Sequence, residues 1–176
     1  MLGVERSRVT LMPFSDEWYT HYQIARDELL KIMGANVVAV HHIGSTAIKG
    51  IYAKPILDVA VVIRRVELLG ISDMEAAGYE YCGERGVAGR HLFVRRINDN
   101  ISTHHIHCYL ENNENLNHSI LFCKFLNKRS DYAKQYNDLK KELADKYPND
   151  RIAYTDGKAF FISHVLEKAK NESYTF

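Results

Sequence analysis

One stretch decides how this chain folds: VVAVHHIGSTA (Val37–Ala47), which resumes as KPILDVAVVI (Lys54–Ile63). The β-branched run at its start predicts a strand. Gly44-Ser45 breaks that strand, and the apolar run after Pro55 predicts a second one. Pro55 suits the opening of a strand, where its missing N–H group is harmless. Two strands joined by a polar turn therefore organise the rest of the sequence.

The turn itself has the composition of an anion-binding site. Gly44 permits a positive φ, so backbone N–H groups and the Ser45 hydroxyl can converge on one point. The segment from Thr46 to Ile51 is long enough for about one helical turn, whose N-terminus would favour anions. We therefore expect Gly44, Ser45 and Thr46 to bind phosphate.

Asp58 is the one charged residue in the second predicted strand. An ionised carboxylate among apolar neighbours costs free energy unless a metal, a cation or backbone donors meet it. One interpretation is a strand-end Asp that caps a neighbouring loop. The other is a metal ligand beside a phosphate-binding turn, and the Ser-bearing turn before Asp58 favours it.

The composition is that of one ordinary globular domain of 176 residues, with 46% hydrophobic and 26% charged residues. A net charge of +1 gives no support for a broad nucleic-acid-binding surface. The longest apolar run, Ile56–Ile63, is too short to span a membrane. Residues 1–10 show no signal peptide. Three separate cysteines without a CxxC pair indicate reduced thiols, so we expect a cytoplasmic protein.

A hairpin is predicted over His91–Ile97 and Ser102–Leu110, joined through Asn98-Asp99-Asn100. Alternation places His105 and His107 on one face of the second strand. A His-x-His pair on a strand can bind a metal, and it can equally make hydrogen bonds at a solvated surface. With Asp58 on a neighbouring strand, both interpretations stay open.

The last third of the chain predicts helices over Leu116–Asn127, from Ser130 or Asp131 to Pro148, and onward from Thr155. The charges of the second helix, Lys140 among them, are expected on a solvated face. Lys158 falls in the first turn of the last helix. A Lys there opposes the helix dipole, as a Lys directed at an anionic substrate would.

The run His42-Ile43-Gly44-Ser45-Thr46-Ala47, with Gly50, Ala53-Lys54-Pro55-Ile56 and Asp58, resembles the signature of the GrpB protein family. That family is similar to nucleotidyltransferases with a DNA polymerase β-like fold. In that superfamily a Gly-Ser turn binds nucleotide phosphate, and the next strand carries two acids, two residues apart, that bind Mg²⁺. Here Ala60 stands where the second acid is usual.

The resemblance covers most of the chain, through Gly89-Arg90, His105-Ile106-His107, Leu121-Phe122 and Ala153-Tyr154-Thr155-Asp156-Gly157-Lys158. One departure is Cys123-Lys124, where the family usually has Arg-Asp. The resemblance implies an α+β fold with a nucleotidyltransferase-like mixed sheet, helices on one face and a helical C-terminal half. We expect a single domain over residues 1–176, with the sheet in about 35–110 and the helices in about 114–170.

Two functions follow from the resemblance. The first is a metal-dependent transferase that uses a nucleoside triphosphate. In it, Ser45 and the turn would hold the phosphates, Asp58 with His105 or His107 would bind Mg²⁺ or Mn²⁺, and the neutralising cations would be Lys54, Arg90 and Lys158. Asp58 and Lys158 would be catalytic. The second is a protein that binds a nucleotide or another phosphorylated small molecule without catalysis, which the missing acid at Ala60 favours.

Overall fold

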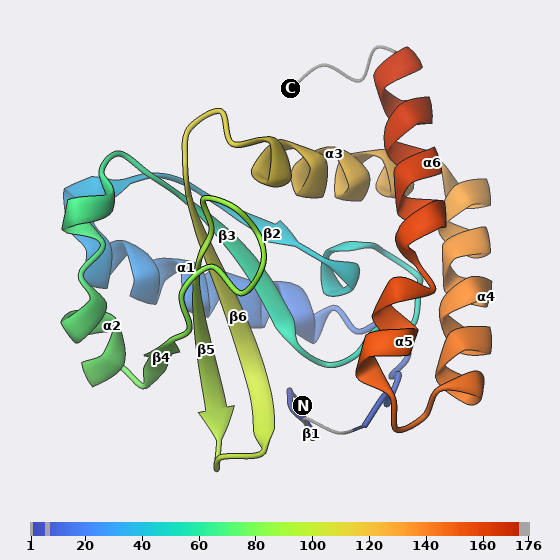
Figure 1. The fold of residues 1–176 in the computed structure, drawn as a ribbon, viewed down its shortest axis with the longest axis horizontal. Coiled ribbons are helices and arrows are strands. Elements are labelled where there is room, and N and C mark those ends of the chain that lie inside the picture. Colours follow the sequence, from blue (N-terminus) through green and yellow to red (C-terminus); the bar gives the residue numbers. More distant parts are fainter. Residues whose placement is uncertain (1, 6–7, 173–176) are drawn as a thin grey trace.

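The computed structural model describes residues 2–5 and 8–172, and it confirms the predicted α+β class (Figure 1). A mixed sheet occupies the first part of the chain and helices follow it. The single domain was predicted over residues 1–176, and this range includes residues outside the described part. The same holds for residues 1–10, where no signal peptide was expected. Among the described residues, no helix combines the length and the apolar character needed to cross a membrane.

Within residues 2–5 and 8–172, the sheet has six strands. Its main path runs through β2 (Val37–Ile43), β3 (Leu57–Ile63), β6 (Ile101–Leu110), β5 (His91–Ile97) and β4 (Tyr79–Tyr81), while β1 (Val4–Glu5) pairs with β6. The β3–β6 pair is parallel and the other pairs are antiparallel. The predicted strands around the Gly-Ser turn and the predicted hairpin therefore share one sheet.

The second predicted strand begins later than expected, at Leu57 and not at Pro55. The Ile56 N–H donates to the Lys54 carbonyl at 2.7 Å, which closes a tight turn around Pro55 before the strand starts. Lys54 thereby sits in a turn at the edge of the sheet.

One face of the sheet is covered by α1 (Glu17–Met33) and the shorter α2 (Ile71–Ala76), with a 3₁₀ turn at Val66–Leu68 before α2 (Figure 1). Alternate residues of β3 point to this face because side chains alternate along a strand. Their cluster is wholly apolar around β3: Leu57, Val59, Val61 and Ile63 pack with Leu29, Met33, Met74, Phe93 and Ile106.

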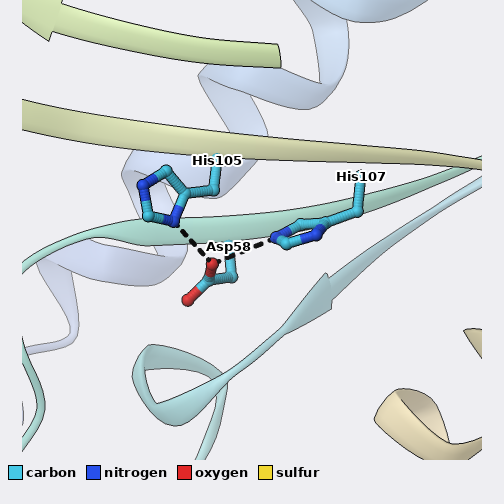
Figure 2. Close-up of side chains that lie close together, drawn as sticks. All are labelled: Asp58, His105 and His107. Atoms are coloured by element: carbon cyan, nitrogen blue, oxygen red, sulfur yellow. Dashed lines mark hydrogen bonds and ion pairs between the residues drawn. The ribbon is translucent and has the colours of Figure 1, made fainter. Parts of the chain in front are cut away.

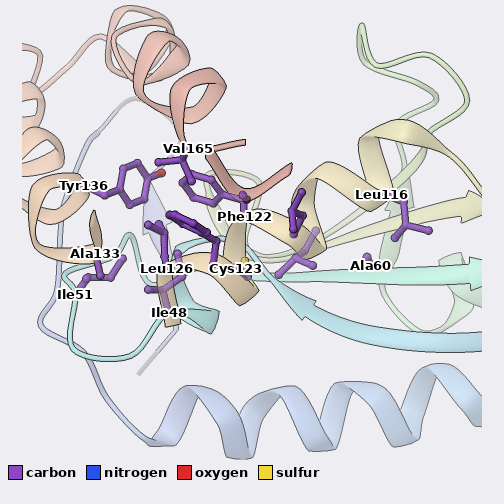
Figure 3. Packing of buried hydrophobic residues seen from close by; sticks show 14 of the residues in the cluster. Ile48, Ile51, Ala60, Leu116, Phe122, Cys123, Leu126, Ala133, Tyr136 and Val165 are labelled. Atoms are coloured by element: carbon purple, nitrogen blue, oxygen red, sulfur yellow. The ribbon is translucent and has the colours of Figure 1, made fainter. Parts of the chain in front are cut away.

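The opposite face of the sheet meets the helices α3 (Glu114–Lys128), α4 (Ser130–Lys146) and α6 (Ala159–Asn171) (Figure 3). Ala60, Val62 and Tyr109 supply the sheet side of this core. Phe122 of α3 packs edge-on against Tyr136 of α4, with ring centroids 5.1 Å apart. This core, between the sheet and the C-terminal helices, lies beside Asp58, because Asp58 and Ala60 share a face of β3.

The predicted last helix is wrong in its start, because two helices occupy that segment. Asp150 caps α5 (Arg151–Asp156), and its carboxylate accepts the N–H groups of Ile152 and Ala153. Thr155 therefore lies inside α5. Lys158 then occupies the N-cap position of α6, so the residue still lies at a helix start.

Candidate active site

Asp58 lies at the centre of the site, with the two histidines of the next strand against it (Figure 2). The parallel register pairs Asp58 with His105 and Ala60 with His107. Asp58 Oδ1 is 3.3 Å from His105 Nδ1 and 3.2 Å from His107 Nε2. The three donor atoms lie within 4.8 Å of one another, which makes them a group able to hold a metal ion.

The local electrostatics keep Asp58 ionised beside His107. Burial raises the pKa of the Asp58 carboxyl, but hydrogen bonds with His105 and His107 and their charge outweigh burial and hold that pKa well below its usual range. Burial also lowers the pKa of His107, although Asp58 opposes this shift. An ionised carboxylate with a neutral imidazole is the protonation state that metal binding requires.

The Gly-Ser turn packs directly onto Asp58. Gly44 has φ 71° and ψ −173°, a conformation that side-chain-bearing residues rarely adopt. A Cβ at Gly44 would lie 2.6 Å from Asp58 Oδ2, so only glycine lets the backbone approach the carboxylate. The helix expected over Thr46–Ile51 is shorter than predicted, a 3₁₀ turn at Ser45–Ala47, because Ile48 already has extended φ and ψ.

The structure separates Thr46 from the other predicted site residues. Its side chain is buried, and Thr46 Oγ1 lies 2.9 Å from His42 Nε2. His42 in turn stacks on Tyr22, with ring centroids 4.9 Å apart. Burial lowers the pKa of His42 to about 4, although Asp58 opposes this shift. Thr46 and His42 therefore stabilise the Gly-Ser turn through contacts with each other and with α1.

Cys123, on α3, is the position where the family resemblance implies an Arg. Its thiol donates to the Gly44 carbonyl at 3.5 Å. Burial raises the pKa of Cys123 to about 12, so it remains a thiol. A small, uncharged side chain therefore holds the turn at this position.

A cavity of about 590 Å³ opens between the sheet and the C-terminal helices. The predicted site residues other than Thr46 line it: Gly44, Ser45, Lys54, Asp58, Arg90, His105, His107 and Lys158. Helix α3 adds polar groups that the sequence analysis did not single out, namely Asn115, His118 and Ser119. Residues far apart in the sequence thus share one cavity of the size that binds small ligands.

Two cationic side chains share one wall of the cavity. Lys54 Nζ and Lys158 Nζ lie 5.2 Å and 4.3 Å from the centre of the Tyr154 ring. Burial lowers the pKa of each lysine to about 8, and the nearby cationic charges add to the shift while Asp58 opposes it. Both ammonium groups remain mainly charged at neutral pH, so this wall suits an anion.

Arg90 reaches the cavity from the loop before β5. Its guanidinium donates to the carbonyls of Glu84 and Arg85, each at 3.1 Å. Glu84 also accepts the Gly89 N–H at 2.6 Å. Arg90 therefore orders its own loop while contributing charge to the cavity.

Lys140 was predicted on a solvated face, and that prediction is wrong. Lys140 is only 1% exposed, and its Nζ donates to the Tyr52 carbonyl. The Tyr52 N–H donates to Asn137 Oδ1 at 2.8 Å, so α4 holds both polar groups of one peptide segment. Its spacing of four from Tyr136 and three to Leu143 was the available signal, because those positions share a helix face.

The fold is similar to that of nucleotidyltransferases. A cytoplasmic RNA terminal U-transferase matches with a TM-score of 0.51 and 18% identity, over 76% of this chain and 41% of that chain. The Cid1 poly(U) polymerase matches with a TM-score of 0.50 and 17% identity, over 76% and 42%. At this identity the likeness concerns the fold alone.

The chain belongs to the GrpB family: the family model described as GrpB protein matches residues 8–168. The crystal structure of the conserved protein GrpB from Enterococcus faecalis matches with a TM-score of 0.87 and 28% identity, over 94% of this chain and 100% of that one. The glutamate-rich protein GrpB of Alkalihalophilus pseudofirmus is 34% identical over 96% of this chain and 99% of its own length. The UPF0157 protein YqkA of Bacillus subtilis is also 34% identical, over 94% of this chain, which spans 48% of that relative.

Proposed function

We propose that this GrpB-family chain is a metal-dependent transferase of the nucleotidyltransferase type that uses a nucleoside triphosphate. The observation that carries the proposal is the contact between the Gly-Ser turn and Asp58. Because a Cβ at Gly44 would lie only 2.6 Å from Asp58 Oδ2, phosphate held by the turn would lie beside a cation held by the carboxylate.

The residues that line the cavity would have three roles: phosphate binding, charge neutralisation and metal binding. The Ser45 hydroxyl and the backbone N–H groups of the turn would bind phosphate oxygens. Lys54, Lys158 and Arg90 would neutralise phosphate charge from the other walls. Asp58, with the two histidines, would hold one divalent ion, which supplies charge neutralisation and orientation of the phosphates when bound.

The surroundings of the cavity support a small substrate. Three cationic side chains, Lys54, Arg90 and Lys158, line the cavity, and a net charge of +1 gives no support for a broad basic surface. We propose that the substrate is a nucleotide or another phosphorylated small molecule, and that the protein acts in the cytoplasm, where its three free cysteines stay reduced.

A second function is favoured by Ala60. Its side chain is fully buried and packs in the core with Leu116 and Phe122, in the place where nucleotidyltransferases usually carry another acid. With that place filled by the core, the chain would bind the nucleotide without transferring its nucleotidyl group. The two functions share the binding site and differ in turnover.

Calorimetry with a non-hydrolysable nucleoside triphosphate, with Mn²⁺ or with EDTA, tests the shared binding site. Wild type should bind at least tenfold more tightly with Mn²⁺, because the ion bridges the carboxylate and the phosphates. Asp58→Asn keeps the shape of the side chain and removes its charge, so it should lose that gain. Asp27→Asn, on the exposed surface of α1, is the matched control.

Pyrophosphate release from nucleoside triphosphates then separates the two functions. Release that depends on Asp58 supports the transferase, whereas tight metal-dependent binding without release supports the binding protein. Equal nucleotide affinity in wild type, Asp58→Asn and Ser45→Ala would refute both.

A further inference from the structure

The donor atoms around Asp58 are a poor match to the ion that the nucleotidyltransferase resemblance implies. Mg²⁺ takes oxygen ligands and is usually held by carboxylates and substrate phosphates. Among the described residues that line the cavity, Asp58 is the only acidic one. Its neighbours in the cluster, His105 and His107, offer imidazole nitrogens.

The place on β3 from which a second carboxylate could join this cluster is occupied by Ala60. Ala60 is fully buried and belongs to the core that α3 covers. The register places His107 directly beside Ala60. Beside this small methyl group, His107 is in contact with Asp58.

Two of the three donor separations in the cluster, those from the carboxylate oxygen to the two imidazole nitrogens, fit a single ion, and all three donors lie within 4.8 Å of one another. Zinc-type ions bind imidazole nitrogen and carboxylate oxygen at about 2.0–2.2 Å, which puts neighbouring donors about 3.0–3.5 Å apart in tetrahedral or octahedral geometry. Asp58 Oδ1 lies 3.3 Å and 3.2 Å from the two histidine nitrogens. Both separations fall in that range.

We propose that Asp58, His105 and His107 bind one imidazole-preferring transition-metal ion, of the Zn²⁺ or Co²⁺ kind, in preference to Mg²⁺. The inference rests on the proposed function, because it concerns the same site. Two imidazoles and one carboxylate select for the first-row series, in which affinity rises from Mn²⁺ through Co²⁺. Three protein ligands also leave coordination positions open for phosphate oxygens, as catalytic sites require.

The test is calorimetric titration of the metal-stripped chain, without nucleotide, with Co²⁺, Zn²⁺, Mn²⁺ and Mg²⁺. We expect Co²⁺ and Zn²⁺ to bind at least 100-fold more tightly than Mg²⁺, with Mn²⁺ between them. The Co²⁺ form should show visible d–d absorption with the intensity of nitrogen ligation. These readouts require no turnover.

A ligand exchange makes the selectivity itself falsifiable. His105→Asp replaces one nitrogen donor by oxygen, so it should lower Co²⁺ affinity at least tenfold and narrow the gap to Mg²⁺. His164→Asn removes an exposed histidine of α6 outside the cluster and should leave all four affinities unchanged. Near-UV circular dichroism of each variant establishes that its fold is intact.

The outcomes distinguish this inference from the proposed function. Mg²⁺ binding within tenfold of Co²⁺ overturns the inference, while nucleotide binding that still depends on Asp58 leaves the function standing. Tight Co²⁺ binding by wild type, lost in Asp58→Asn, supports the inference even where no nucleotide binds, a result that would refute the function. Absence of binding by all four ions overturns both.

Discussion

Replacing Gly44 by Ala should destabilise the protein through two separate costs. The first is the backbone, because φ 71° with ψ −173° costs a residue with a side chain about 1–3 kcal/mol. The second is steric overlap: the new Cβ would lie 2.6 Å, 2.9 Å and 3.0 Å from Oδ2, Cβ and Cγ of Asp58. Overpacking of this kind costs about 1–3 kcal/mol.

The expected loss of unfolding free energy is therefore about 2–6 kcal/mol, the sum of these two ranges. For a domain of this length, 1 kcal/mol shifts the melting temperature by about 2–4 °C, so Gly44→Ala should melt roughly 4–24 °C lower. Urea unfolding followed by circular dichroism gives the free energy, and a thermal melt gives the shift.

Gly50→Ala is the matched control, because Gly50 has φ 74° in the same loop but no atom within 4 Å of its would-be Cβ. It should incur only the backbone cost, so the difference between the two variants measures the approach to Asp58. In an Asp58→Ala background, Gly44→Ala should lose less, since Cγ and Oδ2 are gone. Equal losses for Gly44→Ala and Gly50→Ala would refute the close approach.

Two further predictions concern groups that the fold has buried. Burial lowers the pKa of both His42 and His104 to about 4, and their unfolded forms take up protons below about pH 6.5, so stability should fall as pH drops from 6.5 to 4. Thermal melts at pH 7 and 4.5 measure this, and an undiminished fall in His42→Gln would contradict it. Lys140→Met should cost about 1–3 kcal/mol in urea unfolding, because the buried Tyr52 carbonyl loses its donor. The exposed control Lys134→Met should change by less than about 0.5 kcal/mol, and equal effects of the two would show that the buried hydrogen bond contributes nothing.

Much of the sheet could be predicted from local sequence. Alternation in Ser102–Leu110 separates residues by face, and the structure confirms that Ile106 and Cys108 pack toward α1 while Tyr109 joins the opposite core. The break at Gly44-Ser45 could also be predicted, because glycine permits the required φ. These features depend on residues next to one another in the chain.

The site depended on pairings that local sequence does not encode. Thr46 and Lys140 show this: Thr46 was expected to bind phosphate and Lys140 to face solvent, yet Thr46 contacts His42 and Lys140 contacts the Tyr52 carbonyl. Their side chains have several possible partners within reach of an extended chain. Which hydrogen-bond partner each side chain contacts is decided only when the C-terminal helices and the Gly-Ser turn pack against the rest of the fold.

The sequence by itself determined the strand periodicity, the Gly-Ser turn, the isolated acid at Asp58 and the shared face of His105 and His107. It could not determine that β3 and β6 pair in parallel with Asp58 opposite His105. A strand period of two leaves every even shift of register equally consistent with the alternation. The tertiary structure decided that register, because strand pairing and the packing of α1 and α3 on opposite faces are contacts between segments distant in the chain; in the observed register both apolar sets are buried and the carboxylate meets the two imidazoles.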